Sequence, residues 1–438
     1  MQGNNLFFGK RGTDAVIIPV CLSLQYKFGQ VDYQYFQLRN GIRIIHRSVL
    51  GRIAHCGLMV ETGSRDELSG ESGLAHFIEH MVFKGTERRK AFHIMSRIEN
   101  AGGELNAYTS KEETCIYTSF LAPDYERSLE VFADVAFHSV FPEKEMRKEK
   151  EVVLDEINSY NDNPAELVFD DFEDLLFDGH PLGRNILGDE MHVKAMHRRD
   201  IIRFIGRNYA TNKMVIASVG QIDFRKLVGL VKKYFGEIPA KKNITQREKF
   251  EDYRPSRKVV GKDSYLSHCM TGNVAYARSH PRRLTLELLN NLLGGAAMNS
   301  RLNLNIREKY GFAYSIESMV QTYSDTGFFG VYLGTDPKHL EKSLELIRKE
   351  LNKVSSQKLG SLQLDRAKKQ FVGQLAMSYE SPVNEMLGIA KSHLYNNKVK
   401  TFDEIVALTE QITAVQMMEV AAEIFHPERQ STLIFESR

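Results

Sequence analysis

The chain has 438 residues, of which 42% are hydrophobic and 26% charged, a composition typical of folded globular proteins and not of disordered ones. Its 58 basic and 56 acidic residues leave a formal net charge of +2, so we expect neither a nucleic acid nor a membrane as partner. The four cysteines form no C-x-x-C pair, which argues against a disulfide framework and against a cysteine zinc site. The length exceeds that of one compact core and predicts two domains.

Residues 1–32 are predicted to be a disordered or weakly attached N-terminal extension. Their apolar run at 15–24 is too short to span a bilayer. Lys10 and Arg11 precede it, as in a leader peptide, but Asp14 intervenes and no A-x-A-like cleavage site follows. We therefore expect a cytoplasmic protein, with a targeting role for 1–32 as the alternative.

The next elements follow from hydrophobic periodicity and turn residues. Asn40-Gly41 between two apolar alternations is typical of a tight hairpin. Strands are expected at 35–39, 42–46, 54–60, 104–109 and 114–121, and helices at 73–84, 90–101, 123–137, 142–160 and 164–177. The polar, basic stretch 238–262 lacks periodicity and is interpreted as a linker.

The second part of the chain resembles the first at an offset of about 215–219 residues. E-R-S-L-E at 126–130 matches E-K-S-L-E at 341–345, and Pro164 matches Pro382, in the same order. We infer an α+β protein built by tandem duplication of two similar α/β-sandwich domains, 33–237 and 263–438. Their sheets are expected to be mainly antiparallel and flanked by helices.

Residues 76–80 read H-F-I-E-H. In a chain of this composition, His-x-x-acid-His arises by chance about 0.06 times. On a helix, His76 and His80 lie one turn apart on one face, with Glu79 beside them. Buried imidazoles and a carboxylate need a partner, and two imidazoles at this spacing can bind one Zn²⁺.

A third ligand is expected from the acidic helix 142–160. Glu149 and Glu156 share one face of it, whereas Glu151 and Asp155 lie off that face. Periodicity does not choose among these acids, and a solvated acidic helix is the alternative interpretation. The matching stretch of the second domain, Asn291 to Asn299, has no histidine, and Glu156 matches Gln374 or its neighbours. Metal-type residues are therefore not needed to build the fold.

Longer stretches resemble the pitrilysin/insulysin family of inverzincin zinc metallopeptidases over about residues 33–430. The resemblance is to its short branch, which includes mitochondrial processing peptidase and single-chain bacterial relatives. The stretches are G-L-A-H-F-I-E-H-M-V-F-K-G-T, G-G-E-L-N-A-Y-T, E-K-E-V-V-L-D-E and S-R-L-N-L-N-I-R-E-K-Y-G-F-A-Y-S. The resemblance implies one Zn²⁺ per chain held by His76, His80 and Glu156, with Glu149 supporting the site and Glu79 as general base.

The resemblance also assigns roles outside the metal set. It implies that Arg307 and Tyr314 contact substrate, although the residues alone favour an exposed helix charge and a core aromatic. The stretch 104–109 resembles an edge strand that binds extended substrate, with Asn106 and Ala107 as binding candidates. For Asn106, a turn or strand-end cap is the alternative.

The sequence thus predicts a zinc-dependent endopeptidase for peptides or unfolded polypeptide segments, with 33–237 as catalytic domain, 238–262 as linker and 263–438 as metal-free domain. By the same resemblance, we expect a dimeric chamber, preferably a homodimer in which Arg307 and Tyr314 complete the other chain's site; a heterodimer is possible. The alternatives are a catalytically silent family subunit acting as scaffold or peptide-binding partner, and a zinc-stabilised chaperone-like protein.

Overall fold

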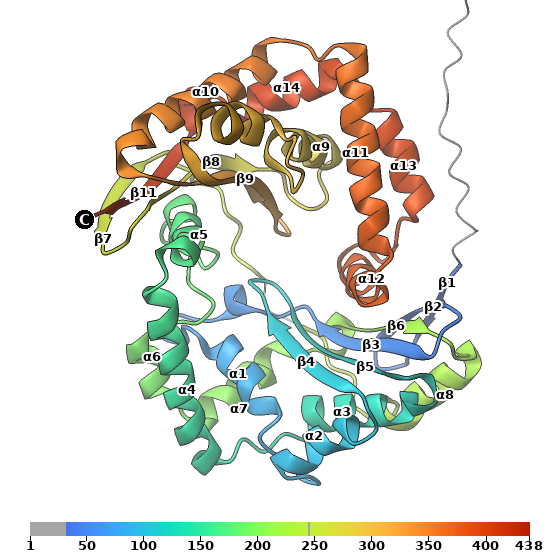
Figure 1. Cartoon of the computed structure of the whole chain (residues 1–438). Coiled ribbons are helices and arrows are strands. Elements are labelled where there is room, and N and C mark those ends of the chain that lie inside the picture. Colours follow the sequence, from blue (N-terminus) through green and yellow to red (C-terminus); the bar gives the residue numbers. More distant parts are fainter. Residues whose placement is uncertain (1–31, 244–245) are drawn as a thin grey trace, which may run out of the picture.

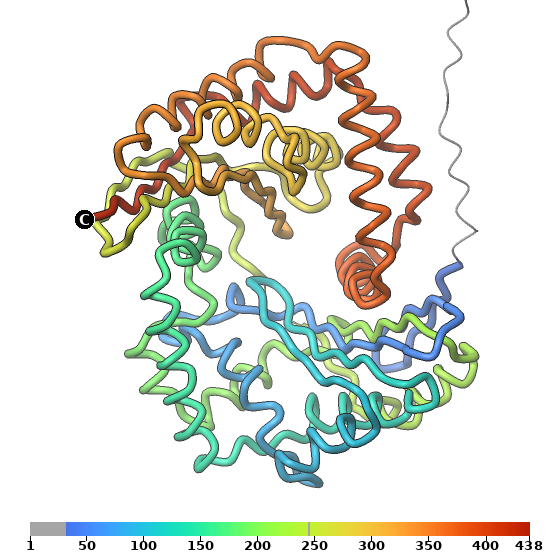
Figure 2. Tube along the Cα trace, in the orientation of Figure 1, coloured from blue at the N-terminus to red at the C-terminus, as the bar shows by residue number. Residues whose placement is uncertain are grey.

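The computed structural model describes residues 32–243 and 246–438 (Figure 1). The predicted extension 1–32 lies outside these residues except for Asp32. The chain forms two similar halves, each a sheet with helices, and the segment that joins them runs between the halves (Figure 2). We refer to residues 33–237 as the first half and to 257–438 as the second half.

The first half contains a six-stranded sheet in the order β1-β2-β6-β3-β5-β4. Its strands are β1 (Tyr33–Gln37), β2 (Arg43–Ser48), β3 (Ile53–Val60), β4 (Glu104–Thr109), β5 (Thr114–Leu121) and β6 (Met214–Gly220). The predicted hairpin at Asn40-Gly41 joins β1 and β2: Gly41 takes a φ of +100°, which favours glycine. All neighbouring strands are antiparallel except β2 and β6.

The second half repeats this topology without a counterpart of β1. Its sheet has the order β7-β11-β8-β10-β9, and only β7 and β11 are parallel. The strands are β7 (Arg257–Lys262), β8 (Ser267–Ala275), β9 (Ala313–Thr322), β10 (Gly327–Thr335) and β11 (Ser431–Ser437). The predicted duplication and fold class are confirmed.

The predicted linker 238–262 is too long, because its last six residues form strand β7. β7 is an edge strand with a half-exposed, basic sequence. Charged side chains protect such an edge from pairing with other chains, and they also remove the apolar alternation that identifies a strand.

The five predicted helices, α1 to α5, lie close to their predicted ranges, and further helices follow in both halves. Those of the first half are α1 (Leu74–Val82), α2 (Ala91–Glu99), α3 (Tyr125–Phe137), α4 (Glu143–Asn161), α5 (Pro164–Leu176), α6 (Glu190–Ala195), α7 (Arg198–Asn208) and α8 (Phe224–Phe235). Those of the second half are α9 (Arg283–Gly294), the π-helical η4 (Asn303–Glu308), α10 (Leu340–Ser356), α11 (Ser361–Tyr379), α12 (Pro382–Asn396), α13 (Phe402–Glu410) and α14 (Ala414–Ile424). Within the described ranges, no helix has both the length and the apolar character needed to cross a membrane.

The two halves exchange one helix each. Helix α12 of the second half packs on β3 and β6 of the first sheet, and α5 of the first half packs on β8 and β11 of the second (Figure 1). The first contact buries Ile45, Met59 and Val215 of the sheet against Met386 and Ile389 of α12. Since alternate strand residues face opposite sides, each sheet has one face covered by its own helices and the other by a helix from the other half.

Residues 33–237 expressed alone should therefore fail to form a stable monomer. Uncovering Ile45, Met59, Val215 and Val219 at roughly 1.5–3 kcal/mol each would cost about 6–12 kcal/mol, comparable with the stability of a whole domain. We expect aggregation, or a melting temperature more than about 10 °C below that of the full chain, in thermal unfolding and size-exclusion experiments. Co-expression with 238–438 should restore the native transition. A monomeric fragment as stable as the full chain would contradict the exchange.

Candidate metal centre

Helix α1 carries the H-F-I-E-H motif and is fixed at its N-terminus by Glu67. The buried Glu67 carboxylate accepts hydrogen bonds from the backbone amides of Gly73 (3.1 Å) and Ala75 (2.8 Å). A carboxyl group at this place satisfies two free amides of the first helical turn, while its burial raises the pKa of Glu67 to about 8. Phe77 and Ile78 bury the opposite side of α1 in the first core, so the orientation of the motif is set from two directions.

His76, His80 and Glu156 converge as predicted. The Nε2 atoms of the two histidines lie 3.2 Å apart. The Oε2 atom of Glu156 lies 3.8 Å from Nε2 of His76 and 3.5 Å from Nε2 of His80. Tetrahedral zinc with bonds near 2.0–2.1 Å separates its ligand atoms by about 3.3–3.5 Å. The three donors therefore fit a zinc ion that keeps one open position. In the described part of the chain, no other group of three or more such side chains comes together in this way.

Glu149 holds His80 in the form that binds a metal. Its Oε1 lies 3.0 Å from Nδ1 of His80, and its Oε2 forms an ion pair with Nζ of Lys84 at 2.7 Å. A carboxylate at Nδ1 places the proton there and leaves the Nε2 lone pair free. Lys84 was missed by the sequence analysis, although its place four residues after His80 on the helical pattern was a usable signal.

His76 is kept neutral by its surroundings. Burial and the neighbouring His80 lower the pKa of His76 to about 4, so its imidazole is uncharged at neutral pH. Neutral imidazole is the form that ligates metals.

Glu79 lies beside the ligands but is not one of them. Its side chain is partly buried, and burial together with the negative charge of Glu156 raises the pKa of Glu79 above its usual value. A carboxylate with a raised pKa near the reacting atoms is suited to accepting and returning a proton.

Strand β4 passes next to α1 and is the edge of the first sheet. Each of its residues pairs with β5, and among the described strands it has no other neighbour. Asn106 is exposed on it and Ala107 is half-buried. The predicted edge strand is present, and its outer backbone groups are available for an added peptide strand.

Arg307 and Tyr314 do not join the metal ligands of the same chain. Arg307 is exposed on η4, and Tyr314 is 77% exposed on β9, both in the second half. Within the described ranges, neither side chain forms a hydrogen bond or ion pair. The interpretation of Tyr314 as a core aromatic is therefore wrong.

The second half has an amide pair where the first has metal ligands. Nδ2 of Asn291 on α9 donates to Oε1 of Gln374 on α11 at 2.8 Å. Asn291 begins the stretch that the duplication matches to the two histidines, and Gln374 lies at or next to the position matched to Glu156. A neutral hydrogen bond thus joins the corresponding two helices of the second half.

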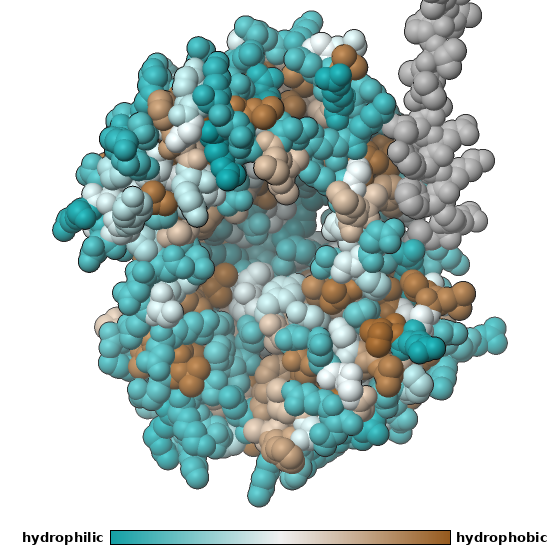
Figure 3. Space-filling model, viewed as in Figure 1, coloured by the Kyte–Doolittle hydropathy of each residue, from teal (hydrophilic) through white to brown (hydrophobic). Residues whose placement is uncertain are grey.

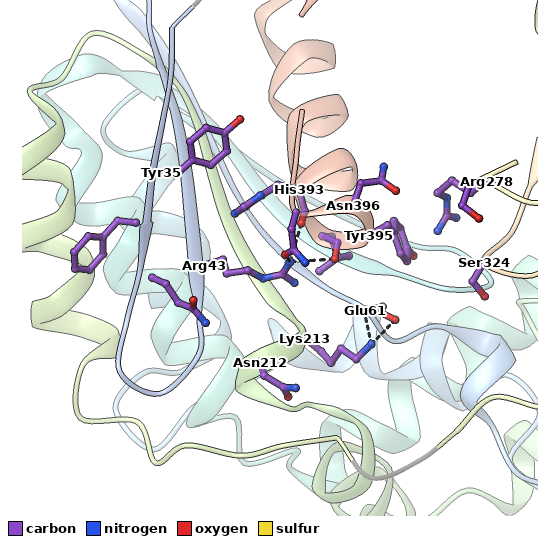
Figure 4. Close-up of a pocket in the computed structure, with 15 residues that line it drawn as sticks. Tyr35, Arg43, Glu61, Asn212, Lys213, Arg278, Ser324, His393, Tyr395 and Asn396 are labelled. Carbon is purple, nitrogen blue, oxygen red and sulfur yellow. Dashed lines mark hydrogen bonds and ion pairs between the residues drawn. The ribbon is translucent and has the colours of Figure 1, made fainter. Parts of the chain in front are cut away.

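A separate pocket of about 1010 Å³ lies between the halves (Figure 4) and contains none of the predicted site residues. Its charged groups have partners inside the protein: Lys213 pairs with Glu61, and Arg43 donates to the carbonyls of His393 and Leu394. The charged groups of this pocket are therefore already hydrogen-bonded or ion-paired within the protein.

Comparisons with known proteins agree with the geometry. Residues 44–190 match the family described as insulinase (peptidase family M16), and 195–371 match the peptidase M16 inactive domain. A Bacillus subtilis protein named "uncharacterized zinc protease YmxG" is 34% identical over 89% of this chain and 95% of its own length. One named "uncharacterized zinc protease SCO5738", from Streptomyces coelicolor, is 33% identical over 88% of this chain and 86% of its own.

Two solved structures share the fold. A protease from Helicobacter pylori superposes with a TM-score of 0.85 at 22% identity, covering 93% of this chain and 100% of its own. A peptidase M16 inactive domain from Pseudomonas fluorescens superposes with a TM-score of 0.87 at 19% identity, covering 93% of this chain and 98% of its own.

The Glu149 contact predicts the effect of one substitution on metal affinity. Glu149→Gln keeps the size of the side chain but removes the charge that fixes His80, so zinc affinity should fall by roughly 10–100-fold in a chelator-competition titration. Glu151→Gln, an exposed position on the same helix, is the matched control and should bind zinc as the unmodified chain does. Equal affinities for both variants would exclude the proposed role of Glu149.

Proposed function

The chain belongs to peptidase family M16, and from this premise we propose that it is a zinc-dependent endopeptidase acting on peptides or unfolded polypeptide segments. The convergence of His76, His80 and Glu156 beside Glu79 is the observation that carries the proposal. A zinc ion bound there supplies Lewis-acid chemistry, since zinc lowers the pKa of a water molecule and polarises a peptide carbonyl.

Glu79 is the proton carrier in this proposal. Its carboxylate accepts the proton of the attacking water and then gives it to the leaving amine, so one group serves both steps. Its partial burial supports this role, because a raised pKa brings the carboxylate nearer to the pH at which it must exchange a proton.

Strand β4 is the proposed substrate platform. A peptide added to this edge binds through its backbone, which makes recognition largely independent of side chains. The hollow between the two halves opens next to this region and is lined mainly by hydrophilic residues (Figure 3), which suits an extended chain better than a folded apolar surface.

We propose that Arg307 and Tyr314 contact substrate bound in the site of a second chain. Both side chains are exposed and lie in the half that lacks the metal ligands. We infer a homodimer in which this pair from one chain stabilises the oxyanion formed in the other chain's site. A heterodimer with a related subunit is the alternative.

A catalytically silent family subunit is the second candidate. The C-terminal match is described as an inactive domain, but in the first half the three ligand atoms converge and the Glu149 support is in place. A silent scaffold would not need this set, so the observation favours the enzyme.

Glu79→Gln should abolish turnover and leave the metal site intact. We expect cleavage of an unstructured peptide, followed by mass spectrometry, to fall by about 10²–10⁴-fold because proton transfer is lost. Zinc content should stay near one per chain. Chelation of zinc should abolish cleavage in the unmodified protein. Full turnover by Glu79→Gln would contradict the mechanism.

Mixing two inactive variants tests the shared site. A heterodimer of a Glu79→Gln chain with a Tyr314→Phe chain contains one site in which the metal residues, Glu79 and Tyr314 are all unaltered. Purified heterodimers should therefore recover activity, up to about half that of the unmodified dimer. If verified heterodimers stay inactive, Tyr314 does not act across the interface.

A further inference from the structure

The turn between β4 and β5 carries three consecutive charged side chains that are buried. Lys111 is 3% exposed, Glu112 1% and Glu113 2%. A charged hairpin tip is ordinarily solvated. Here the tip inserts between the two halves (Figure 1), so the charges must find partners inside the protein.

Glu112 receives partners from both halves. Its carboxylate accepts hydrogen bonds from Nη1 of Arg65 at 2.8 Å, from the amide and hydroxyl of Ser324 at 2.9 and 2.6 Å, and from Nη2 of Arg278 at 3.1 Å. Burial opposes its ionisation, but Arg247, Arg278 and Ser324 hold the pKa of Glu112 below its usual value. One ionised group of the first half is thus fixed by two residues of the second.

The arginines extend this contact to the connecting segment. Arg65 forms two hydrogen bonds to the Asp325 carboxylate, at 2.6 and 2.7 Å, and one to the carbonyl of Glu248 at 2.5 Å. Arg247 binds Asp66 through two nitrogens, both at 2.8 Å. We term Arg65, Glu112, Arg247, Arg278 and Asp325 the interhalf lock.

The interhalf lock is connected to α1 and to β4, the two elements of the proposed active site that bind the metal and the substrate. The amides of Ser64 and Arg65 donate to the carbonyls of Ser110 and Lys111, at 3.1 and 2.8 Å, so the hairpin tip and the segment before α1 are joined backbone to backbone. Two residues later, Glu67 caps α1. Strand β4 ends at Thr109, directly before the tip.

We propose that the interhalf lock sets the β4 edge against α1, with Glu112 as a positioning residue of the peptidase site. The second half would then arrange the substrate strand over the metal ligands without contacting them. Because these charges are buried, added salt screens them little. Removing one charge leaves the others uncompensated, so a single substitution should release the tip.

Glu112→Gln tests the lock by amide exchange, which needs no turnover. Deuterium uptake in β4, residues 104–109, should accelerate by roughly tenfold or more because local opening becomes easier. Zinc affinity should stay within about threefold, since the ligands lie on α1 and α4. The inference rests on the proposed function for one readout only: KM for an unstructured peptide should rise about tenfold, with a smaller change in kcat.

Glu385→Gln is the matched control. Glu385 is a buried carboxylate of the second half that contacts the first half through Arg47 and the hydroxyl of Tyr33. It lies near the start of α12, whereas the α12 residues that bind Glu113 of the hairpin tip, Lys391 and Tyr395, lie six and ten residues further along. Its substitution should leave β4 exchange unchanged. Equal acceleration in both variants, or none in Glu112→Gln, would overturn the inference.

Asp325→Asn is the alternative test of the interhalf lock if the Glu112→Gln chain does not fold. It removes the negative charge that pairs with Arg65 in the second half but keeps the Arg65–Glu112 pair, so β4 exchange should accelerate in the same direction by a smaller factor. Unchanged exchange in a folded Asp325→Asn chain would also overturn the inference. An unmodified chain without peptidase activity would refute the proposed function but leave these exchange results interpretable.

Discussion

A sheet with two apolar faces needs two covering layers, and each half of this chain supplies only one for its own sheet. The missing layers are α12 on the first sheet and α5 on the second. Non-directional burial of these faces dominates the stability of such a fold, and the exchange fixes how the halves meet. That geometry brings together the surfaces on which the interhalf lock, the buried β4–β5 turn and the hollow between the halves lie.

The duplication separates what the fold requires from what the chemistry requires. In both halves, the helix that follows one sheet strand, α1 after β3 and α9 after β8, packs against a long helix further along the chain, α4 and α11 respectively. In the first half, this contact contains three metal-type donors; in the second, it contains the Asn291–Gln374 hydrogen bond. The helix pair is thus stable with neutral amides. His76 is buried and His80 half-buried, where imidazoles without a partner are disfavoured, and this is the physical reason to regard the histidines as functional.

Much of this could be predicted because it is encoded locally. The Asn40-Gly41 turn, the helical motif at 76–80 and the shared face of Glu149 and Glu156 depend on periodicity within a few residues. The exchange of α5 and α12 could not be predicted, because the apolar face of a helix does not indicate which of the two sheets it covers. The burial of the β4–β5 turn could not be predicted for the same reason: K-E-E is typical of a solvated tip, and only the long-range contacts with Arg278 and Ser324 explain its burial.

The exchange of α5 and α12 also constrains how the chain can fold during synthesis. Strands β2 to β6 leave the ribosome before α12, which lies more than 160 residues beyond the end of β6. One apolar face of the first sheet therefore stays uncovered while the second half is synthesised. Helix α5 emerges before the sheet that it will cover exists. Contacts of such wide sequence separation slow folding and prolong the exposure of apolar surface. Nascent chains of this protein therefore expose one apolar face of the first sheet until α12 has been made.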